Sequence, residues 1–254
     1  MADRNEILTY CNTRLDADAY QDVALNGLQV EGKAELNRLA VAVSASEHTL
    51  AEATAWNADA LLVHHGLFWG GSVQPLVGLL GRRLRRLFQH DLNLIAYHLP
   101  LDGHGELGNN AQLACQLGLT AVDRFGVVAG MPLGVIGAYA EPVTLPALLE
   151  RVAKLLDRAP TAVGAISRNA PIERIAILSG SGYGTLAEAA GRGCQALLTG
   201  DIREPTMAEA RELGIVAIAA GHEATERSGV QALAGELTER FELETHYIAD
   251  PNPI

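Results

Sequence analysis

The chain has 254 residues, 48% of them hydrophobic, which is enough to bury the core of one large domain or of two smaller ones. Its formal net charge of −11 would repel phosphate backbones over most of the surface, so nucleic acid is not an expected partner. The sequence starts without a basic and apolar leader, and no segment approaches the roughly 18 apolar residues of a membrane span. We therefore expect a cytoplasmic protein with no membrane partner.

The three cysteines are odd in number and widely spaced. Cys11, Cys115 and Cys194 form no Cys-x-x-Cys arrangement. This spacing is typical of reduced thiols, and we expect all three to be small buried hydrophobes that form no disulfide and bind no metal.

Two segments of the chain have similar sequences. Residues 38–65 align without a gap with residues 174–201, and ten of the 28 pairs are identical. Composition alone would give about two to four identities, so we interpret the match as an internal duplication. Each copy predicts a strand, a helix and a second strand, which favours mixed sheets covered by helices. The predicted strands are 39–43, 60–63, 175–178 and 196–199, and the predicted helices are 49–56 and 185–191.

A further apolar run in each half leads to a histidine. Leu92–Tyr97 precedes His98, and Ile215–Ala220 precedes His222 after one glycine. Segments with helical spacing follow at 109–117 and 229–240 and are expected to pack back on the sheet.

The middle of the chain is uncharged and rich in glycine. Residues 125–140 contain four glycines and one proline, a composition that predicts a linker leading into edge strands. We therefore expect two similar α/β domains, residues 1–125 and 126–254, with the C-terminal segment able to pack back on the first domain.

Histidines and carboxylates gather where the predicted strands end. One apolar run ends in two adjacent histidines, and two later runs lead to a histidine with a carboxylate four residues further on. Such groups are costly to bury unless they are paired, protonated or bound to a metal, so the pattern predicts a metal site. The residues are His64, His65, His98, Asp102, His222 and Glu226.

The geometry expected of these residues favours a pair of ions. Neighbouring side chains of a strand point to opposite faces, so His64 and His65 would not bind the same ion. If the segment after Gly221 opens a helix, His222 and Glu226 share a face. Paired divalent ions often share a bridging carboxylate. Two alternatives are polar groups satisfied separately at strand ends, and a mononuclear protease site at His222–Glu226, which lacks the second histidine of that pattern.

Short motifs are spread over nearly the whole chain. They are Asn26–Gly32, Val63–Gly66, His98–His104, Gly108–Asn110, Gly221–Arg227 and Pro251–Pro253. Together they resemble the signatures of the NIF-three-like dinuclear-metal proteins, also labelled GTP cyclohydrolase I type 2 homologues. The resemblance implies two interlocked α/β domains, a paired-metal site between them and a toroidal homohexamer.

The resemblance also assigns roles to residues of this sequence. It implies that His65 and Asp102 bind one ion, that His64 and His222 bind the other, and that Glu226 bridges them. His98 is then a near-site histidine that could carry protons. His104 fits a turn as well as a site, and Asp201 stands where family members often have glutamate, which leaves its role open.

Two further features have a functional and a purely structural interpretation. The loop 179–184 is glycine-rich and could bind an anion through backbone N–H groups, or could simply be a tight turn. A predicted helix at 79–88 carries four arginines, which suit a solvated face, a subunit contact or a basic rim for phosphorylated substrates.

We expect a metal-dependent hydrolase with two divalent ions per chain. A metal-bridged hydroxide would attack carbon or phosphorus of a small molecule, such as a nucleotide or phosphorylated compound, with His98 as the catalytic residue. The ligand set has no sulfur, so Zn, Fe, Mn, Co and Ni all fit and Cu(I) is disfavoured. The alternative is a non-catalytic metal-binding, metal-carrier or toroidal partner protein.

Overall fold

The computed structural model describes residues 1–70, 75–164, 167 and 169–254. By internal contacts the chain divides into two units, and each is described by itself. Unit 1 comprises Met1–Leu101 and Gly229–Asp250, and unit 2 comprises Asp102–Ser228 and Pro251–Ile254. The domain boundary predicted from the sequence lies between residues 125 and 126 instead. The contact units differ from it because β7 and β8 join the sheet of unit 2 and the C-terminal helix returns to unit 1.

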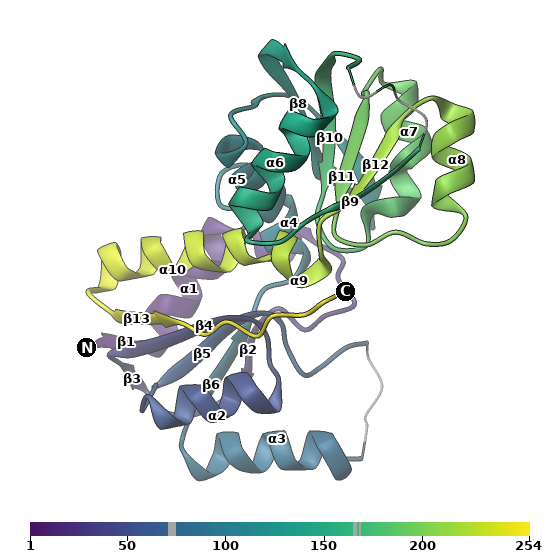
Figure 1. The fold of residues 1–254 in the computed structure, drawn as a ribbon. Coiled ribbons are helices and arrows are strands. Elements are labelled where there is room, and N and C mark those ends of the chain that lie inside the picture. The colour runs from purple at the N-terminus through teal and green to yellow at the C-terminus, as the bar shows by residue number, and fades with distance from the viewer. Residues whose placement is uncertain (71–74, 165–166, 168) are drawn as a thin grey trace. The chain divides into compact units, whose positions relative to one another are not determined.

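Unit 1 is built on a mixed sheet in the order β13-β4-β5-β6-β2. Strands β13, β4, β5 and β6 run parallel, and β2 is antiparallel to β6. Helices α2 and α3 cover one face of this sheet, whereas α1 and α10 lie on the other (Figure 1). The strands are β1 (Ala2–Asp3), β2 (Gly27–Val30), β3 (Glu35–Leu36), β4 (Arg38–Ser44), β5 (Ala60–His65), β6 (Asn93–Ala96) and β13 (Glu244–Tyr247). The helices are α1 (Arg4–Arg14), η1 (Ala17–Ala19), α2 (Glu47–Ala55) and α3 (Gly78–Gln89), and two further helices, α4 (Leu99–Gly103) and α10 (Arg227–Phe241), cross the unit boundary.

Unit 2 contains a second mixed sheet, in the order β7-β8-β10-β11-β12-β9. Strands β10, β11 and β12 are parallel, and their neighbours β8 and β9 are antiparallel to them. Helices α5 and α6 pack on one face around a core that includes Leu148 and Ile175. The strands are β7 (Thr120–Val128), β8 (Met131–Val143), β9 (Thr161–Gly164), β10 (Ile172–Leu178), β11 (Ala196–Thr199) and β12 (Val216–Ala219). The helices are α5 (Asn109–Gln116), α6 (Leu145–Leu156), η2 (Gly182–Thr185), α7 (Leu186–Gly191), α8 (Thr206–Leu213) and α9 (His222–Thr225).

The structure confirms the predicted α/β class, with mixed sheets covered by helices. It also shows why the repeated segments form strand, helix and strand. The apolar runs of β4 and β5 are buried, and α2 begins where Ser46 and Thr49 form a reciprocal capping box. In unit 1 Ala40 pairs with Leu61, and in unit 2 Ala176 pairs with Leu197, so the register agrees at the same sequence shift. The duplication itself stays a prediction.

Two predictions about particular segments are wrong. Residues 125–140 form no linker but the end of β7 and most of β8, and β8 lies between β7 and β10 within the sheet. Cys115 is exposed, whereas Cys11 and Cys194 are buried, and all three are free thiols. Among the described residues, no helix is both long and apolar enough to span a bilayer.

Candidate metal centre

In unit 1 three histidines meet at the carboxyl ends of β5 and β6. His64 and His65 end β5, and His98 follows β6 by two residues. The ring centroids of His64 lie 4.6 Å from those of His65 and 4.9 Å from those of His98. One ring nitrogen of each histidine lies within 4.8 Å of the others, close enough for one ion to contact them. The prediction that these two adjacent histidines bind different ions stays a prediction.

The same ring nitrogen of each histidine is held by the protein. His64 Nδ1 lies 3.0 Å from the Tyr97 carbonyl oxygen, and His98 Nδ1 lies 2.9 Å from Asp22 Oδ1. Since both partners accept, Nδ1 carries the proton in the neutral ring, and Nε2 has the lone pair that a metal ion uses. His65 Nδ1 lies 3.0 Å from the Ser44 hydroxyl, which positions the ring but, as a group that both donates and accepts, does not select the tautomer.

Asp22 positions His98, and sequence reasoning missed it. Its carboxylate accepts hydrogen bonds from the backbone N–H of Ala24 and Leu99 and from the Asn26 amide, in addition to His98. Burial alone would raise the pKa of Asp22, but His98 and these backbone donors outweigh it and hold the pKa well below its usual range. No local pattern links an aspartate to a histidine 76 positions away, so only the fold reveals the pair.

In unit 2 His222 and Glu226 form a second donor pair. Helix α9 begins at His222, and His222 Nε2 lies 3.3 Å from Glu226 Oε1, as the four-residue spacing predicts. His222 Nδ1 lies 2.8 Å from Asp201 Oδ2. The Glu226 carboxylate raises the pKa of His222 to about 9 against the opposing effect of burial, and Asp201 adds to the rise. A proton on this ring would therefore compete with a metal ion at neutral pH.

Asp102 also belongs to unit 2 and is held by polar side chains. Its Oδ1 accepts hydrogen bonds from Asn109 Nδ2 at 3.0 Å and from Ser179 Oγ at 3.1 Å. Asn110 supports the same corner, because its Oδ1 accepts from the Ser179 backbone N–H at 2.7 Å. Sequence reasoning did not connect Ser179 with Asp102, although Asn109 and Asn110 lie within a motif it singled out.

Two residues and one loop whose roles the sequence left open have structural contacts. Asp201 orients His222 through Nδ1. His104 Nδ1 accepts from the backbone N–H of Glu106 and Leu107, which is a turn contact. In the loop 179–184 the N–H groups of Gly180 and Gly182 donate to Thr225 and Thr199. Because side chains already use these donors, the structure favours a tight turn over an anion site.

The donors fit a divalent cation. Every donor is imidazole nitrogen or carboxylate oxygen, and most are buried or half-buried. His98 and His222 each donate Nδ1–H to a carboxylate, the arrangement that commonly supports a metal-bound histidine. The chain thus has histidine and carboxylate groups in each unit that could bind metal.

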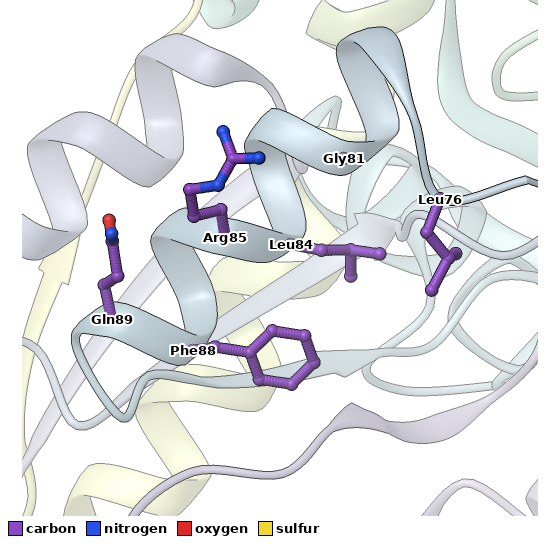
Figure 2. A pocket seen from close by; sticks show the side chains of 6 residues that line it. All are labelled: Leu76, Gly81, Leu84, Arg85, Phe88 and Gln89. Atoms are coloured by element: carbon purple, nitrogen blue, oxygen red, sulfur yellow. The ribbon is translucent and has the colours of Figure 1, made fainter.

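A pocket on α3 lies away from these donors in unit 1. It has a volume of about 370 Å³ and is lined by Leu76, Gly81, Leu84, Arg85, Phe88 and Gln89. Figure 2 shows Leu84 and Phe88 on one side of the helix with Leu76 beside them. Its described lining includes no histidine, cysteine or carboxylate.

The fold and the donor groups define a mixed α/β protein with candidate metal-binding clusters at the carboxyl ends of parallel strands. Residues 2–253 match the family described as Duf34/NIF3 (NGG1p interacting factor 3), and the chain belongs to this family.

Relatives confirm the match over the full length. A protein of Allochromatium vinosum named GTP cyclohydrolase 1 type 2 homolog is 43% identical over 253 residues, covering 100% of this chain and 98% of the relative. A Pyrococcus horikoshii protein of the same name is 43% identical over 252 residues, covering 99% and 100%. Among solved structures, protein ybgI, described as of unknown function, has 39% identity and a TM-score of 0.93, with both chains fully covered. TTHA1606 from Thermus thermophilus has 37% identity and a TM-score of 0.88, again with full coverage of both chains.

Proposed function

We propose that the chain is a metal-dependent hydrolase that binds two divalent ions with His64, His65, Asp102, His222 and Glu226. The observation that carries the proposal is the way in which two of these ligands, His64 and His222, are held through Nδ1 by a carbonyl and a carboxylate oxygen, which makes Nε2 the ligating nitrogen. In His222 this nitrogen lies 3.3 Å from Oε1 of Glu226, another proposed ligand. The proposal joins donors of both units. It is supported by their matching chemistry and by the family, whose relatives are named as cyclohydrolase homologues.

When bound, divalent ions would acidify a coordinated water and polarise an electrophilic carbon or phosphorus of a small, phosphorylated or nucleotide-like substrate. The residues of the chain then have separate tasks. His98 Nε2 can accept a proton and later return it, because Asp22 stabilises the imidazolium form through Nδ1. Asn109 and Ser179 keep the Asp102 carboxylate in one orientation.

Metal analysis of single variants tests the ligand assignment. Protein purified without added metal should contain divalent ions, and His65→Ala or His222→Ala should lose bound metal by elemental analysis. His48→Ala is the matched control, since His48 is an exposed histidine on α2 and should leave the metal content unchanged. Full metal content in both ligand variants would contradict the assignment.

The hydrolase itself is tested with His98→Ala and Asp22→Asn. In a screen of phosphorylated and heterocyclic substrates with the native metal, His98→Ala should lower turnover by about 10²- to 10⁴-fold, the usual contribution of a general acid or base. Asp22→Asn should lower it less, because His98 stays in place but loses its charged partner. Metal transfer that is unaffected by either change, with no turnover in the wild type, would favour a metal carrier instead.

We further infer a homohexamer, on the basis of the family resemblance alone. We infer a location in the cytoplasm from the three widely spaced cysteines, which are typical of a reducing compartment. Native mass spectrometry of the purified chain tests the assembly, and a monomer at micromolar concentration would contradict it.

A further inference from the structure

The last four residues of the chain lie against the start of α9. The Ile254 carbonyl oxygen accepts a hydrogen bond from the backbone N–H of His222 at 3.1 Å. This donor is the first N–H of a short helix and has no partner within the helix itself. The tail therefore satisfies a backbone group of the residue whose ring belongs to the candidate metal centre.

Arg158 holds the tail in this position. Its Nη1 donates to the carbonyl oxygens of Asn252 at 2.6 Å and Ile254 at 3.4 Å, and its Nη2 donates to that of Pro253. One guanidinium thus contacts consecutive carbonyls of the tail, which suits its fixed, planar set of donors. The tail is itself shaped for this contact, because Asn252 Oδ1 accepts from the Ile254 N–H at 3.0 Å and two prolines restrict its backbone.

Arg158 also lies directly on the backbone that precedes His222. A Cβ at Gly221 would lie 2.6 Å from Arg158 Nη1, and Gly221 has a φ of +97°, which only glycine adopts readily. On another side, a Cβ at Gly200 would lie 2.7 Å from the His222 Cα. The backbone of His222 is therefore enclosed by Gly200, by Arg158 and by the tail.

The end of α6 supplies a second contact to the same region. The helix ends at Leu156, and Asp157 takes the left-handed conformation with a φ of +51°, which leads directly to Arg158. The Leu156 carbonyl accepts from Arg227, and Arg227 also pairs with Glu223 of α9 at 2.6 Å. The first two residues of α9 are thus linked to the end of α6, His222 through the tail and Arg158, and Glu223 through Arg227.

We propose that Arg158 and Pro251–Ile254 form a strap that fixes the His222 backbone, and that Arg158 is a positioning residue for metal binding by His222. The metal-binding part of this inference rests on the proposed function. Asp201 orients the imidazole, and the strap holds the Cα from which the imidazole extends. The motif Pro251–Pro253 contains no proposed metal ligand, and its role is to position the backbone of His222.

Two variants and two measurements test the strap. Arg158→Ala, and a chain that ends at Asp250, should each speed hydrogen exchange of the His222 backbone amide by about 10-fold or more, measured on the full, metal-free protein. Each should also weaken Zn²⁺ or Co²⁺ binding by about 10-fold in a chelator competition, the usual effect of removing a group that supports a ligand. Arg158→Lys should recover part of the protection of the His222 amide and part of the metal affinity, because an ammonium can donate to one or two of the carbonyls.

The effects of Arg158→Ala and of the truncation at Asp250 on metal affinity should not be additive. If Arg158 acts through the tail, the double variant should lose no more metal affinity than either single variant. Arg192→Ala is the control, because it removes an arginine of the same unit that pairs with Asp123 and Glu188, and both measurements should stay at wild-type values.

The outcomes separate the strap from the proposed function. Unchanged exchange at His222 in both variants overturns the strap. Faster exchange with unchanged metal affinity overturns the positioning role. If His222→Ala binds metal as tightly as the wild type, the proposed ligand set fails, while the exchange measurement still decides whether the strap holds the backbone.

Discussion

At the scale of single residues, the hydrogen-bond partners of the histidines fix the orientation and the tautomer of the rings in the candidate metal centre. A free imidazole rotates and exists as two tautomers, so a metal ion must select one arrangement out of several. In this chain a carbonyl and two carboxylates make that selection beforehand, through Nδ1 of His64, His98 and His222.

Gly180 gives a prediction about the donors of unit 2. Its φ is +59°, and a Cβ there would contact Glu226 Oε1 and lie 3.2 Å from His222 Nε2. Gly180→Ala should therefore displace both donors and weaken metal binding by about 10-fold or more, an effect comparable to losing a supporting group. Isothermal titration with Zn²⁺ measures this change. Gly184→Ala is the control, because open space surrounds that position, and equal affinities of the two variants would contradict the prediction.

Sequence reasoning identified the ligand-type residues but not the residues that hold them. His64, His98 and His222 stand out because each ends or follows an apolar run, which is a local signal. Asp22 and Ser179 contact the site from positions more than 70 residues away from His98 and Asp102, respectively. Such pairs are set by tertiary structure, and no spacing rule along one sequence reveals them.

At the scale of elements, the buried parallel strands were predictable and the glycine-rich hairpin was not. The apolar runs of β4, β5, β10 and β11 are long enough to be recognised, and their observed ends differ from the predicted ends by only a few residues. In β8 the glycines have a packing role. The Phe125 ring lies against Gly134, and Leu119 Cβ lies 2.8 Å from where a Cβ of Gly137 would be. Those glycines mark side chains packed across the sheet, not the flexible linker that composition suggests.

Asp59 fastens the beginning of β4 and β5 and gives a pH prediction. Its Oδ2 accepts from the N–H of Asn37 and Arg38, and its Oδ1 lies 2.6 Å from Lys33 Nζ. Burial alone would raise the pKa of Asp59, but Lys33 and the two N–H groups outweigh it and lower the pKa below its ordinary value. The resulting stability is fully present above the pKa of the unfolded state, about 3.9, and is lost as the pH falls through the lower pKa of the folded state.

Asp59→Asn should accordingly destabilise the protein by about 1–3 kcal/mol at pH 7, the usual cost of weakening buried hydrogen bonds to a charged group. The difference from the wild type should shrink as the pH approaches 3. Urea unfolding at a series of pH values measures it. Asp91→Asn is the control, because Asp91 is an exposed aspartate of the same unit. A difference in the free energy of unfolding between Asp59→Asn and the wild type that stays constant with pH would contradict the proposed linkage.

At the scale of the whole molecule, each unit has a core of its own. Leu61 is fully buried in the core that β5 forms with α2 and α3, and Leu198 is 1% exposed in the core that β11 forms with α5 and α6. The two cores have no residue in common. We therefore expect local damage in one core to remain largely within its own unit.

Leu61→Ala and Leu198→Ala test this independence. Each substitution should lower the free energy of unfolding by about 2–5 kcal/mol, because it leaves a cavity that the surrounding side chains fill only in part. Hydrogen exchange should show lost protection mainly in the strands of the altered unit. Equal loss of protection in both sheets for each variant would show instead that the molecule unfolds as one cooperative body.

The return of the chain to unit 1 has a consequence for folding. Strand β13 pairs in parallel with β4, and 206 positions separate Arg38 from Glu244 in that pairing. Because residues 102–228 of unit 2 lie between these two strands in the sequence, β13 can cover the edge of β4 only after a loop of that length has closed, which makes this pairing a slow step of folding. Until then the uncovered edge of β4 is a place where a strand of another chain could add.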